Sequence, residues 1–584
     1  MLASGPDVVR VLCDAKGPDK AFDYSVPEHL SAQAVIGALV RVDLHGRRIG
    51  GWIVDIDPPD ATAGDRLVPL RAVSGLGPDV GVLKLARWAA HRWAGRPSHF
   101  LRTASPPRMV ARLGEPRLSG LRPEPRSPAT SELLEAGGGT LRLPPTADHL
   151  PVIWSVLERG SCLVIVPGLE QVAILAGRLR RAGVTVAVLP DDWAAAAAGV
   201  DVVVGTRTAA FARLGAVAAI VVIDEHDERL QSESSPTWHA REVAIERGTR
   251  LGVPVVLVSP VPSVEARHGR VWRAPDRERE RRGWPRIEVV DLESEDPRQR
   301  GLISGRLIEE LRDHTRRVVC VVNTVGRSRL LACSACRALA RCERCDGICS
   351  ADAGGDLACR RCGASRPSVC AVCGASAFRN LRPGVARLRE EMAAAAGREV
   401  VDIEAARHDA GSTIDAPVIV GTEAALHRVG HADTVVICDL DDELLAARYT
   451  ASARTAALLA LAARRAGRAE SGGRVILQTR MVDHPAVAAL ADLDLDRWSE
   501  IERSQRSVLG LPPFGSLARI DGPGAEEFVE GIRRASAGHP DVVVGGADGR
   551  WQVRGPDPAA LADALASGVR VVGRRVRIAV DPVR

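Results

Sequence analysis

The sequence has 584 residues, which is too long for one hydrophobic core and therefore predicts several domains. Apolar residues make up 46% of the chain, a share that excludes an intrinsically disordered protein. The net charge is only +5, so a uniformly basic nucleic-acid-binding protein is also excluded, and any nucleic-acid-binding face must be local.

Three features bear on the location of the protein and the state of its cysteines. Residues 1–17 lack a basic segment followed by an apolar stretch, so we expect no signal peptide. Apolar runs such as 216–223 end at charged residues well short of a membrane span. We therefore expect a cytoplasmic protein without membrane contact, in which 13 cysteines favour metal binding over disulfides.

Residues 1–108 have the pattern of a small β-rich module. Segments 40–44 and 49–56 show the composition and flanking turn residues of strands, and 80–92 shows the pattern of a helix. Sequence rich in proline, arginine and glycine over residues 109–140 predicts a linker.

Residues 141–266 alternate between apolar, strand-like runs and helical patterns. The segment 169–181 has helical periodicity, and the near-continuous valine and isoleucine runs around it predict a parallel sheet covered on both faces. The expected strands are 161–166, 184–189, 200–204, 219–223 and 253–258.

A second alternating unit follows a charged segment and is interrupted by a cysteine-rich insert. We expect this unit to begin within 267–330, to carry the insert at 331–378 and to continue over 379–498. Residues 499–584 predict a helix and a small α+β domain. The expected fold class is therefore α/β, with two parallel-sheet lobes.

Four C-x-x-C pairs lie within the insert. Such a turn directs two thiolates at one tetrahedral ion, and two turns complete the Cys₄ site that is usual for structural zinc. The eight cysteines therefore predict two Zn²⁺ ions, with buried or redox-active cysteines as the alternative. The spacing leaves the pairing open, a nested arrangement being reasonable, and Cys349 is expected to be a bystander. The pairs are Cys333/Cys336, Cys342/Cys345, Cys359/Cys362 and Cys370/Cys373.

Several short motifs follow one another in a specific order along the chain. They are AFDYSVPEHL (21–30), VVVGTRTAAF, IDEHDERLQSE, VSPVPSVEA, the cysteine cluster, ARRAGR (463–468) and LGLPPF (509–514). In this order they resemble the PriA family of replication-restart proteins over most of the chain. The resemblance implies two RecA-like helicase lobes of superfamily 2, an inserted double zinc domain, a β-rich N-terminal DNA-binding domain and an α+β C-terminal domain.

The resemblance also implies what the protein does and what it binds. A protein of this family recognises stalled or abandoned replication forks and promotes primosome assembly and helicase loading. The implied partners are branched fork DNA, single-stranded DNA, single-stranded DNA-binding protein, and primosome and helicase-loading proteins. The implied zinc pairing is nested, with Cys333, Cys336, Cys370 and Cys373 on one ion and Cys342, Cys345, Cys359 and Cys362 on the other.

A pocket for the 3′ end of a nascent strand is implied within residues 1–108. The matching positions are Phe22, Asp23, Gly37 and Arg71. An aromatic ring that stacks on a base, a carboxylate and a basic residue suit such a pocket. The alternative is that Phe22 fills the core of the module.

The first strand and helix of a helicase lobe should carry the phosphate-binding loop, here near 141–153. Such a loop needs glycines whose amides cradle phosphates, and a lysine followed by serine or threonine. The stretch reads LRLPPTADHLPVI, and no lysine lies beyond Lys84. We therefore expect no ATP hydrolysis, while the sequence leaves ATP binding open.

Other parts of a nucleotide site remain as vestiges. Asp224 and Glu225 follow a strand where such a pair would hold Mg²⁺ and orient water, and Arg465 and Arg468 match the family's arginine-finger positions. The leading interpretation is a fork-binding assembly factor without helicase activity of its own. The alternatives are an active ATP-dependent 3′-to-5′ DNA helicase and a protein scaffold whose zinc ribbons bind partners.

Overall fold

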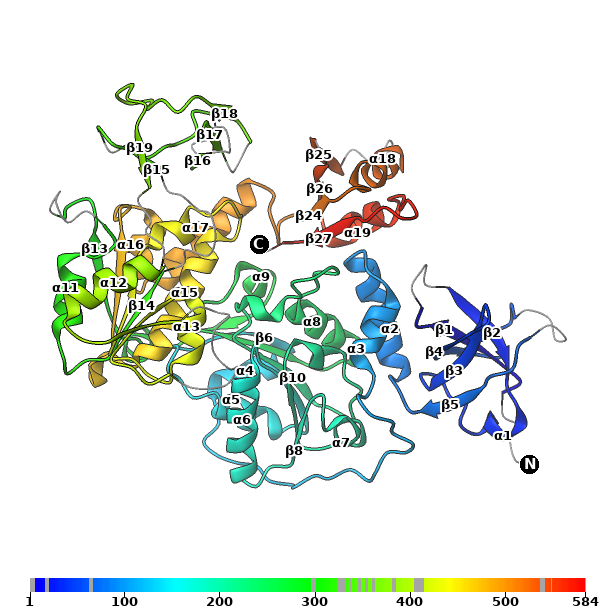
Figure 1. The fold of residues 1–584 in the computed structure, drawn as a ribbon. Helices are drawn as coiled ribbons and strands as arrows, with labels where there is room; N and C mark the ends of the chain where they lie inside the picture. The colour runs from blue at the N-terminus through cyan, green and yellow to red at the C-terminus, as the bar shows by residue number, and fades with distance from the viewer. Residues whose placement is uncertain are drawn as a thin grey trace. The chain divides into compact units, whose positions relative to one another are not determined.

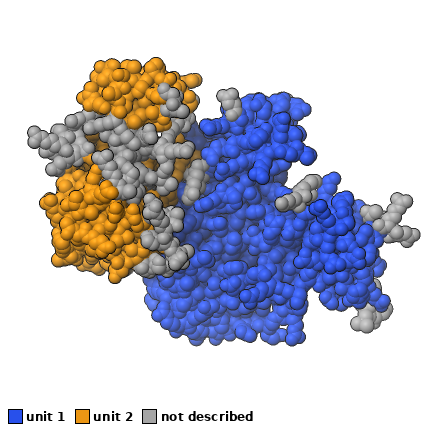
Figure 2. Space-filling view, in the orientation of Figure 1, with its two compact units in different colours: residues 1–142, 148–274, 506–582 blue, residues 143–147, 275–505, 583–584 orange. Residues whose placement is uncertain are grey.

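The computed structural model describes residues 6–15, 20–61, 67–295, 301–322, 331–336, 338–344, 348–351, 355–359, 363–380, 385–403, 414–535, 541–547 and 549–582. The chain packs as two units (Figure 2). Unit 1 comprises residues 1–142, 148–274 and 506–582, and unit 2 comprises residues 143–147, 275–505 and 583–584.

Unit 1 begins with a five-stranded antiparallel sheet in the order β2-β1-β4-β3-β5 (Figure 1). The expected strands 40–44 and 49–56 are β3 and β4, and inward-facing valine and isoleucine side chains of the sheet form its core. The elements are β1 (Val8–Cys13), β2 (Ala21–Ser25), α1 (Glu28–Ser31), β3 (Leu39–Leu44), β4 (Arg47–Ile56) and β5 (Ala72–Gly75).

Two helices follow this sheet and pack into the main core of unit 1. The helix α2 (Val80–Arg92) has the expected bounds, and Asp79 caps it by accepting a hydrogen bond from the Val82 amide at 2.9 Å. The helix α3 (Pro97–Ala104) is too short for its periodicity to predict, although proline at its first position suits a helix start. Both helices bury their apolar faces in a core that they share with the following lobe and with Leu12 and Trp52 of the N-terminal sheet.

The lobe of unit 1 is built on a seven-stranded sheet in the order β12-β6-β11-β10-β7-β9-β8, and its strand pairs are parallel. The strands are β6 (Gly138–Arg142), β7 (Cys162–Ile165), β8 (Val186–Val188), β9 (Val202–Gly205), β10 (Ala219–Ile223), β11 (Val255–Ser259) and β12 (Trp272–Arg273). Its helices are α4 (Pro128–Glu135), α5 (Leu150–Leu157), α6 (Leu169–Arg181), α7 (Trp193–Ala198), α8 (Ala240–Leu251) and α9 (Val264–Arg267), with 3₁₀ turns η2 (Arg207–Phe211) and η3 (Glu228–Leu230).

Part of the segment expected to be a linker, 109–140, belongs to this lobe. It contains α4 and the start of β6. The glycines that suggested a linker instead allow close strand packing, because a Cβ on Gly139 would lie 2.4 Å from the carbonyl oxygen of Val271.

Unit 2 contains a six-stranded parallel sheet in the order β13-β23-β22-β14-β21-β20. Its strands are β13 (Arg286–Asp291), β14 (Val318–Val321), β20 (Val400–Ile403), β21 (Val418–Gly421), β22 (Thr434–Ile437) and β23 (Arg474–Thr479). Its helices are α10 (Arg277–Arg282), α11 (Gly305–Arg312), α12 (Val385–Ala396), α13 (Glu423–Arg428), α14 (Leu440–Leu444), α15 (Ala451–Ala466), α16 (Pro485–Ala491) and α17 (Leu495–Val508), with the 3₁₀ turn η4 (Ala469–Ser471).

The cysteine-rich insert interrupts unit 2 between β14 and α12, and the C-terminal domain completes unit 1. The insert has short strands β15 (Leu331–Cys333), β16 (Cys349–Ala351), β17 (Leu357–Cys359), β18 (Ser365–Arg366) and β19 (Phe378–Asn380). The C-terminal domain has β24 (Ser516–Asp521), α18 (Ala525–Ala535), β25 (Val543–Ala547), β26 (Arg550–Gly555), α19 (Pro558–Ala566) and β27 (Arg577–Val580), with the sheet order β25-β26-β24-β27.

The expected fold class is confirmed: two parallel sheets, an N-terminal antiparallel sheet, a cysteine-rich insert and a small C-terminal antiparallel sheet. In unit 1 one continuous core joins α2, α3, the parallel lobe and the C-terminal domain. The guanidinium of Arg92 in α2 pairs with both the lobe and the C-terminal domain, because it lies 3.2 Å from Glu242 and 2.5 Å from Asp581. Among the described residues, no helix has both the length and the apolar run that a bilayer crossing requires.

Candidate metal centre and nucleic-acid interface

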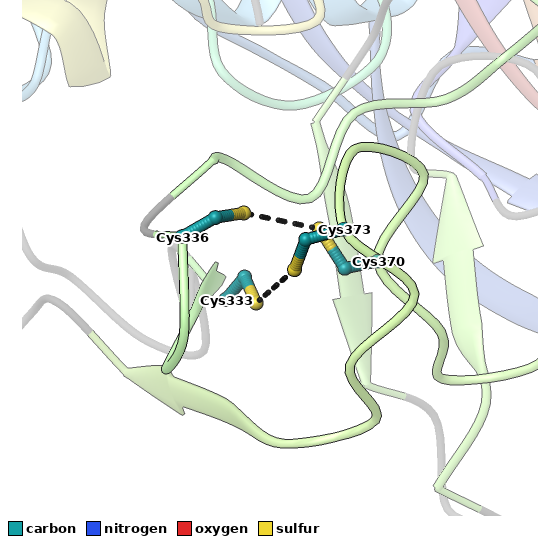
Figure 3. A group of neighbouring side chains, drawn as sticks. All are labelled: Cys333, Cys336, Cys370 and Cys373. Atoms are coloured by element: carbon teal, nitrogen blue, oxygen red, sulfur yellow. Dashed lines mark hydrogen bonds between the residues drawn. The ribbon is translucent and has the colours of Figure 1, made fainter.

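Four cysteine thiols from the two ends of the insert lie together in unit 2 (Figure 3). Cys333 ends β15 with Cys336 in the turn after it, and Cys370 and Cys373 lie in the turn that precedes β19. All four Sγ atoms lie within 4.8 Å of one another, and the Cys333–Cys373 and Cys336–Cys370 sulfur pairs are each 3.5 Å apart. Zinc–thiolate bonds of about 2.3 Å would place the sulfurs about 3.8 Å apart, so the four thiols fit a tetrahedral site.

The backbone favours the ionised form of one thiol in each turn, whereas the pKa of Cys336 is raised, because the lowering effect of the Ala338 amide is outweighed by hydrogen bonds from the other thiols. Backbone amides, first that of Cys336, lower the pKa of the Cys333 thiol to about 6. Amides of the second turn, first that of Cys373, likewise lower the pKa of the Cys370 thiol. Gly374 supplies the left-handed residue that closes this turn, with φ +74°. Because the thiolate is the form that binds metal, the two turns are prepared for an ion.

The inner cysteine pairs are described only in part, since Cys345 and Cys362 lie outside the described residues. Cys342 and Cys359 lie together, as the nested pairing requires, and Cys349 joins them. The three Sγ atoms lie within 4.8 Å of one another, and all three residues are buried. Cys349, which the sequence predicts to be a bystander, lies beside these thiols because antiparallel pairing of β16 with β17 places it directly opposite Cys359.

Both clusters suit zinc by the chemistry of their donors. The outer cluster offers four thiols and the described part of the inner cluster offers three, and soft thiolate sulfur favours Zn²⁺ over hard cations. The two clusters are thus compatible with two zinc sites, the number that the sequence predicts.

Phe22 and Gly37, two residues expected at a 3′-end pocket, lie at the two ends of one row of paired residues that crosses the N-terminal sheet. Phe22 of β2 lies opposite Val11, which lies opposite Ile53, and the Gly37 amide donates a hydrogen bond to the Ile53 carbonyl at 2.7 Å. Gly37 has φ +84°, and a Cβ there would lie 1.7 Å from the Pro78 carbonyl oxygen, so only glycine fits. Phe22 is partly buried against the core of the sheet, as the alternative interpretation expects.

The other two expected residues, Asp23 and Arg71, each form an ion pair. Asp23 lies 2.8 Å from Arg10 and its side chain is only 7% exposed. Arg71 Nε lies 2.5 Å from Asp43 Oδ2, but the Arg71 side chain remains 55% exposed. The Tyr24 hydroxyl donates a hydrogen bond to the backbone carbonyl of Asp43 at 3.3 Å. Asp43 therefore contacts both Arg71 and β2, the strand that carries Tyr24 and Asp23.

The loop between β6 and α5 supplies its own anion at the start of the helix. Its segment 143–149 includes two consecutive prolines, which have no amide hydrogen to donate. Asp148 Oδ1 accepts a hydrogen bond from the Leu150 amide at 3.0 Å, and Arg178 donates to the same carboxylate at 2.7 and 2.9 Å. Burial alone would raise the pKa of Asp148, but the contacts with Arg178 and Leu150 lower it overall, so the carboxylate stays ionised. A helix N-terminus attracts anions, and here the anion belongs to the protein.

Asp224 and Glu225 follow β10, and neighbours in unit 1 bind both side chains. Glu225 is fully buried; one carboxylate oxygen accepts from the Ser263 amide at 2.7 Å, and the other accepts from the Ser263 hydroxyl at 2.8 Å and from Arg241 at 2.9 Å. Asp224 accepts from Gln171 Nε2 at 2.9 Å. Both carboxylate oxygens of Glu225 thus accept hydrogen bonds from neighbouring protein groups.

His239 caps α8, the helix that carries Arg241, and gives unit 1 a pH dependence. His239 Nδ1 accepts a hydrogen bond from the Arg241 amide at 3.1 Å, and burial lowers the pKa of His239 well below its usual value. In the unfolded chain the imidazole takes up a proton at about pH 6.5, so the unfolded state binds more protons below that pH and folding loses stability as the pH falls.

We therefore expect calorimetry between about pH 7 and pH 5 to show a steeper fall of the unfolding temperature in the wild type than in His239→Asn. Asparagine keeps a capping acceptor but does not titrate. Equal pH slopes for the two proteins would contradict this account of His239.

The expected arginine-finger residues lie at the end of α15 in unit 2, where the segment 143–147 also packs. Arg468 Nε donates to Thr146 Oγ1 at 3.2 Å, and the adjacent Arg464 Nε donates to the Pro145 carbonyl at 3.0 Å. Arg465 is half-buried in the last turn of the helix. Arg468 therefore contacts a side chain of the protein at a position where a nucleotide contact was expected.

Three residues that contribute to these sites were not predicted from the sequence: Asp148, Arg241 and Ser263. Asp148 carries a usable signal, an acidic residue just before a helix, which favours a helix cap over a phosphate site. Arg241 and Ser263 carry none, because they lie 16 and 38 residues from Glu225 and meet it only through the fold.

Comparison with known proteins agrees with this architecture. The family model of the PriA 3′ DNA-binding domain (3′BD) matches residues 10–106. The replication restart protein PriA of Haemophilus influenzae is 28% identical over 415 residues, covering 64% of this chain and 56% of the relative. A probable replication restart protein PriA of Mycobacterium bovis is 27% identical over 585 residues, covering 86% of this chain and 85% of the relative.

A third relative, the replication restart protein PriA of Treponema pallidum, is 31% identical over 344 residues, covering 55% of this chain and 51% of the relative. The chain thus spans only about half the length of the Haemophilus and Treponema relatives, and most of the length of the Mycobacterium one. The chain is thus similar to the PriA 3′ DNA-binding domain over residues 10–106 and to PriA replication restart proteins, at about 27% identity, over most of its length.

Proposed function

We propose that this protein is a replication restart factor that binds stalled or abandoned forks and promotes primosome assembly and helicase loading without helicase activity of its own. The match of residues 10–106 to a 3′ DNA-binding domain supports the DNA-binding part, and the similarity to replication restart proteins supports the restart part. Its proposed ligands are branched fork DNA and single-stranded DNA, and its proposed partners are primosome and helicase-loading proteins and single-stranded DNA-binding protein.

The observation that carries the non-catalytic part is the ionised Asp148 at the start of α5. A phosphate placed there would be repelled by this carboxylate, which already accepts a hydrogen bond from the Leu150 amide, and the ion pair with Arg178 reduces this repulsion without removing it. The same loop has no lysine to offset this repulsion and no amide hydrogen on its two prolines. Each donor lost from a phosphoryl-transfer site typically costs a few kcal/mol, so we propose a loss of about 10⁴-fold or more in hydrolysis rate.

Phe22, Asp23, Gly37 and Arg71 form the proposed 3′-end pocket. The exposed guanidinium of Arg71 supplies positive charge, and the left-handed turn at Gly37, buried against the Pro78 carbonyl, fixes the local backbone. The ion pair between Asp23 on the edge strand β2 and Arg10 on the neighbouring strand β1 orients both groups. In this proposal Phe22 offers only the partly exposed part of its ring to a terminal base.

The proposed cofactors are two zinc ions, which hold the insert in its fold. The outer ion is bound by Cys333, Cys336, Cys370 and Cys373. The inner ion is bound by thiols from the set Cys342, Cys345, Cys359 and Cys362. The second candidate function is an active ATP-dependent 3′-to-5′ DNA helicase, which the vestigial positions Asp224, Glu225, Arg465 and Arg468 favour.

Fork binding and ATP turnover measured on one zinc-replete preparation test this proposal. We expect tighter binding to forks that have a free 3′-hydroxyl at the junction than to forks with a blocked 3′ end, and ATP turnover no higher than a protein-free blank. Arg71→Ala should reduce the preference for the free 3′ end, and raising the salt concentration should weaken binding to both forks.

Two controls make the result decisive. Arg48→Ala removes an exposed arginine of the same sheet that is not expected in the pocket, so it should leave the preference for a free 3′ end intact. Fork-stimulated ATP turnover that is abolished by Glu225→Gln would favour the helicase instead. Absence of any fork binding would favour a protein scaffold.

A further inference from the structure

Cys349 occupies a position in the inner cysteine cluster that the C-x-x-C spacing does not account for. Its amide donates to the Ala340 carbonyl at 2.8 Å, which fixes the start of β16 against the strand-like segment before Cys342. Its side chain is 1% exposed, and its Sγ lies within 4.8 Å of the sulfurs of Cys342 and Cys359.

Three mutually close sulfurs fit three corners of one tetrahedral zinc site, where neighbouring thiolates lie about 3.8 Å apart. The outer cluster provides a comparison in the same insert: there the four thiols of two C-x-x-C turns gather as one group of four. The inner group of the described residues differs because a strand residue, Cys349, takes part with the first cysteine of each turn.

The alternative role for Cys349 is packing. A buried cysteine behaves as a small apolar side chain, and Cys349 lies in an apolar cluster with Leu331, Ala340 and Leu357. Cys342 and Cys359 belong to the same cluster, so packing accounts for the burial of Cys349. Metal binding accounts in addition for the mutual approach of the three Sγ atoms, because it draws all ligand sulfurs to one centre.

We propose that Cys349 is a ligand thiol of the inner zinc ion, so that this site holds five thiols for four coordination positions. The inference rests on the proposed two-zinc insert. The five are Cys342, Cys345, Cys349, Cys359 and Cys362, of which an ion binds four at a time. When Cys349 enters, one zinc–sulfur bond forms and another breaks, and the proton of the Cys349 thiol passes to the departing thiolate. Charge and ligand number at the ion are unchanged.

A consequence is that the inner site tolerates the loss of one cysteine and the outer site does not. We expect Cys342→Ala to retain about two zinc ions per chain, because four thiols remain, whereas Cys333→Ala should fall to about one. The two variants are matched, since each removes the buried first cysteine of a C-x-x-C pair. The double variant Cys342→Ala/Cys349→Ala should also fall to about one ion.

Two measurements of the metal sites do not depend on activity. One is the zinc content by inductively coupled plasma mass spectrometry, and the other is the visible spectrum after replacement of zinc with Co²⁺. Cys349→Ala alone should keep two ions, which shows that this change leaves the insert folded. Loss of one ion from Cys342→Ala would overturn the role of Cys349 while leaving the two-zinc insert in place. A wild-type protein without zinc would instead overturn the metal part of the proposed function.

Discussion

Replacing Arg241 with alanine is expected to lower the free energy of unfolding of unit 1 by about 3–5 kcal/mol. Arg241 lies 2.9 Å from Glu225, and their side chains are 7% and 0% exposed. The variant would leave the Glu225 carboxylate buried without its counter-charge, and the two hydrogen bonds from Ser263 cannot replace that charge. Urea unfolding followed by tryptophan fluorescence measures the loss.

Arg250 provides the matched control because it lies on the same helix, α8. It pairs with Glu246 one turn away at 2.6 Å on a partly exposed face, so Arg250→Ala should cost less than about 1 kcal/mol. Adding Glu225→Gln to Arg241→Ala should recover part of the lost stability, since it removes the uncompensated charge. A cost for Arg241→Ala as small as that for Arg250→Ala would show that Glu225 does not depend on this partner.

The second large effect is expected at Phe100 of α3, where alanine should destabilise unit 1 by about 3–5 kcal/mol. Its fully buried ring lies 5.1 Å from the ring of Phe211 and 6.3 Å from that of Trp238. Removing it leaves a cavity where the N-terminal helices meet the parallel lobe, and it also removes aromatic contacts. Urea unfolding is again the measurement.

Phe22→Ala is the control for this second prediction because it makes the same chemical change at a partly exposed position. We expect it to cost clearly less stability than Phe100→Ala and, under the proposed function, to weaken binding to forks with a free 3′ end. Similar stability losses for the two variants would contradict the account of the shared aromatic core.

Elements with strong periodicity could be predicted from the sequence almost to the residue. The helices α2 and α6 and the strand β10 have the expected bounds, because each has a clear apolar pattern with polar residues at its ends. The strand β13 could not be predicted in the same way. Its residues lie in a charged segment, and its place at the edge of the sheet of unit 2 needs few apolar side chains.

The candidate sites were predictable to the extent that their residues lie close in sequence. The C-x-x-C turns are local, so their spacing alone indicates metal binding. Cys349 has no partner at that spacing, and only the antiparallel pairing of β16 with β17 brings it to Cys359. The contact of Arg241 with Glu225 likewise depends on where a helix packs against a strand end, which no local pattern specifies.

The continuous core of unit 1 has a consequence for the order in which the chain can fold during synthesis. The helix α2 is buried in part by the C-terminal domain, and Arg92 meets Asp581 almost five hundred residues later (|i−j| = 489). Residues 275–505, the bulk of unit 2, are translated between these partners. Unit 1 therefore completes its core only after residues 506–582 have left the ribosome, when residues 275–505 have already emerged, and the apolar face of α2 is fully covered only then.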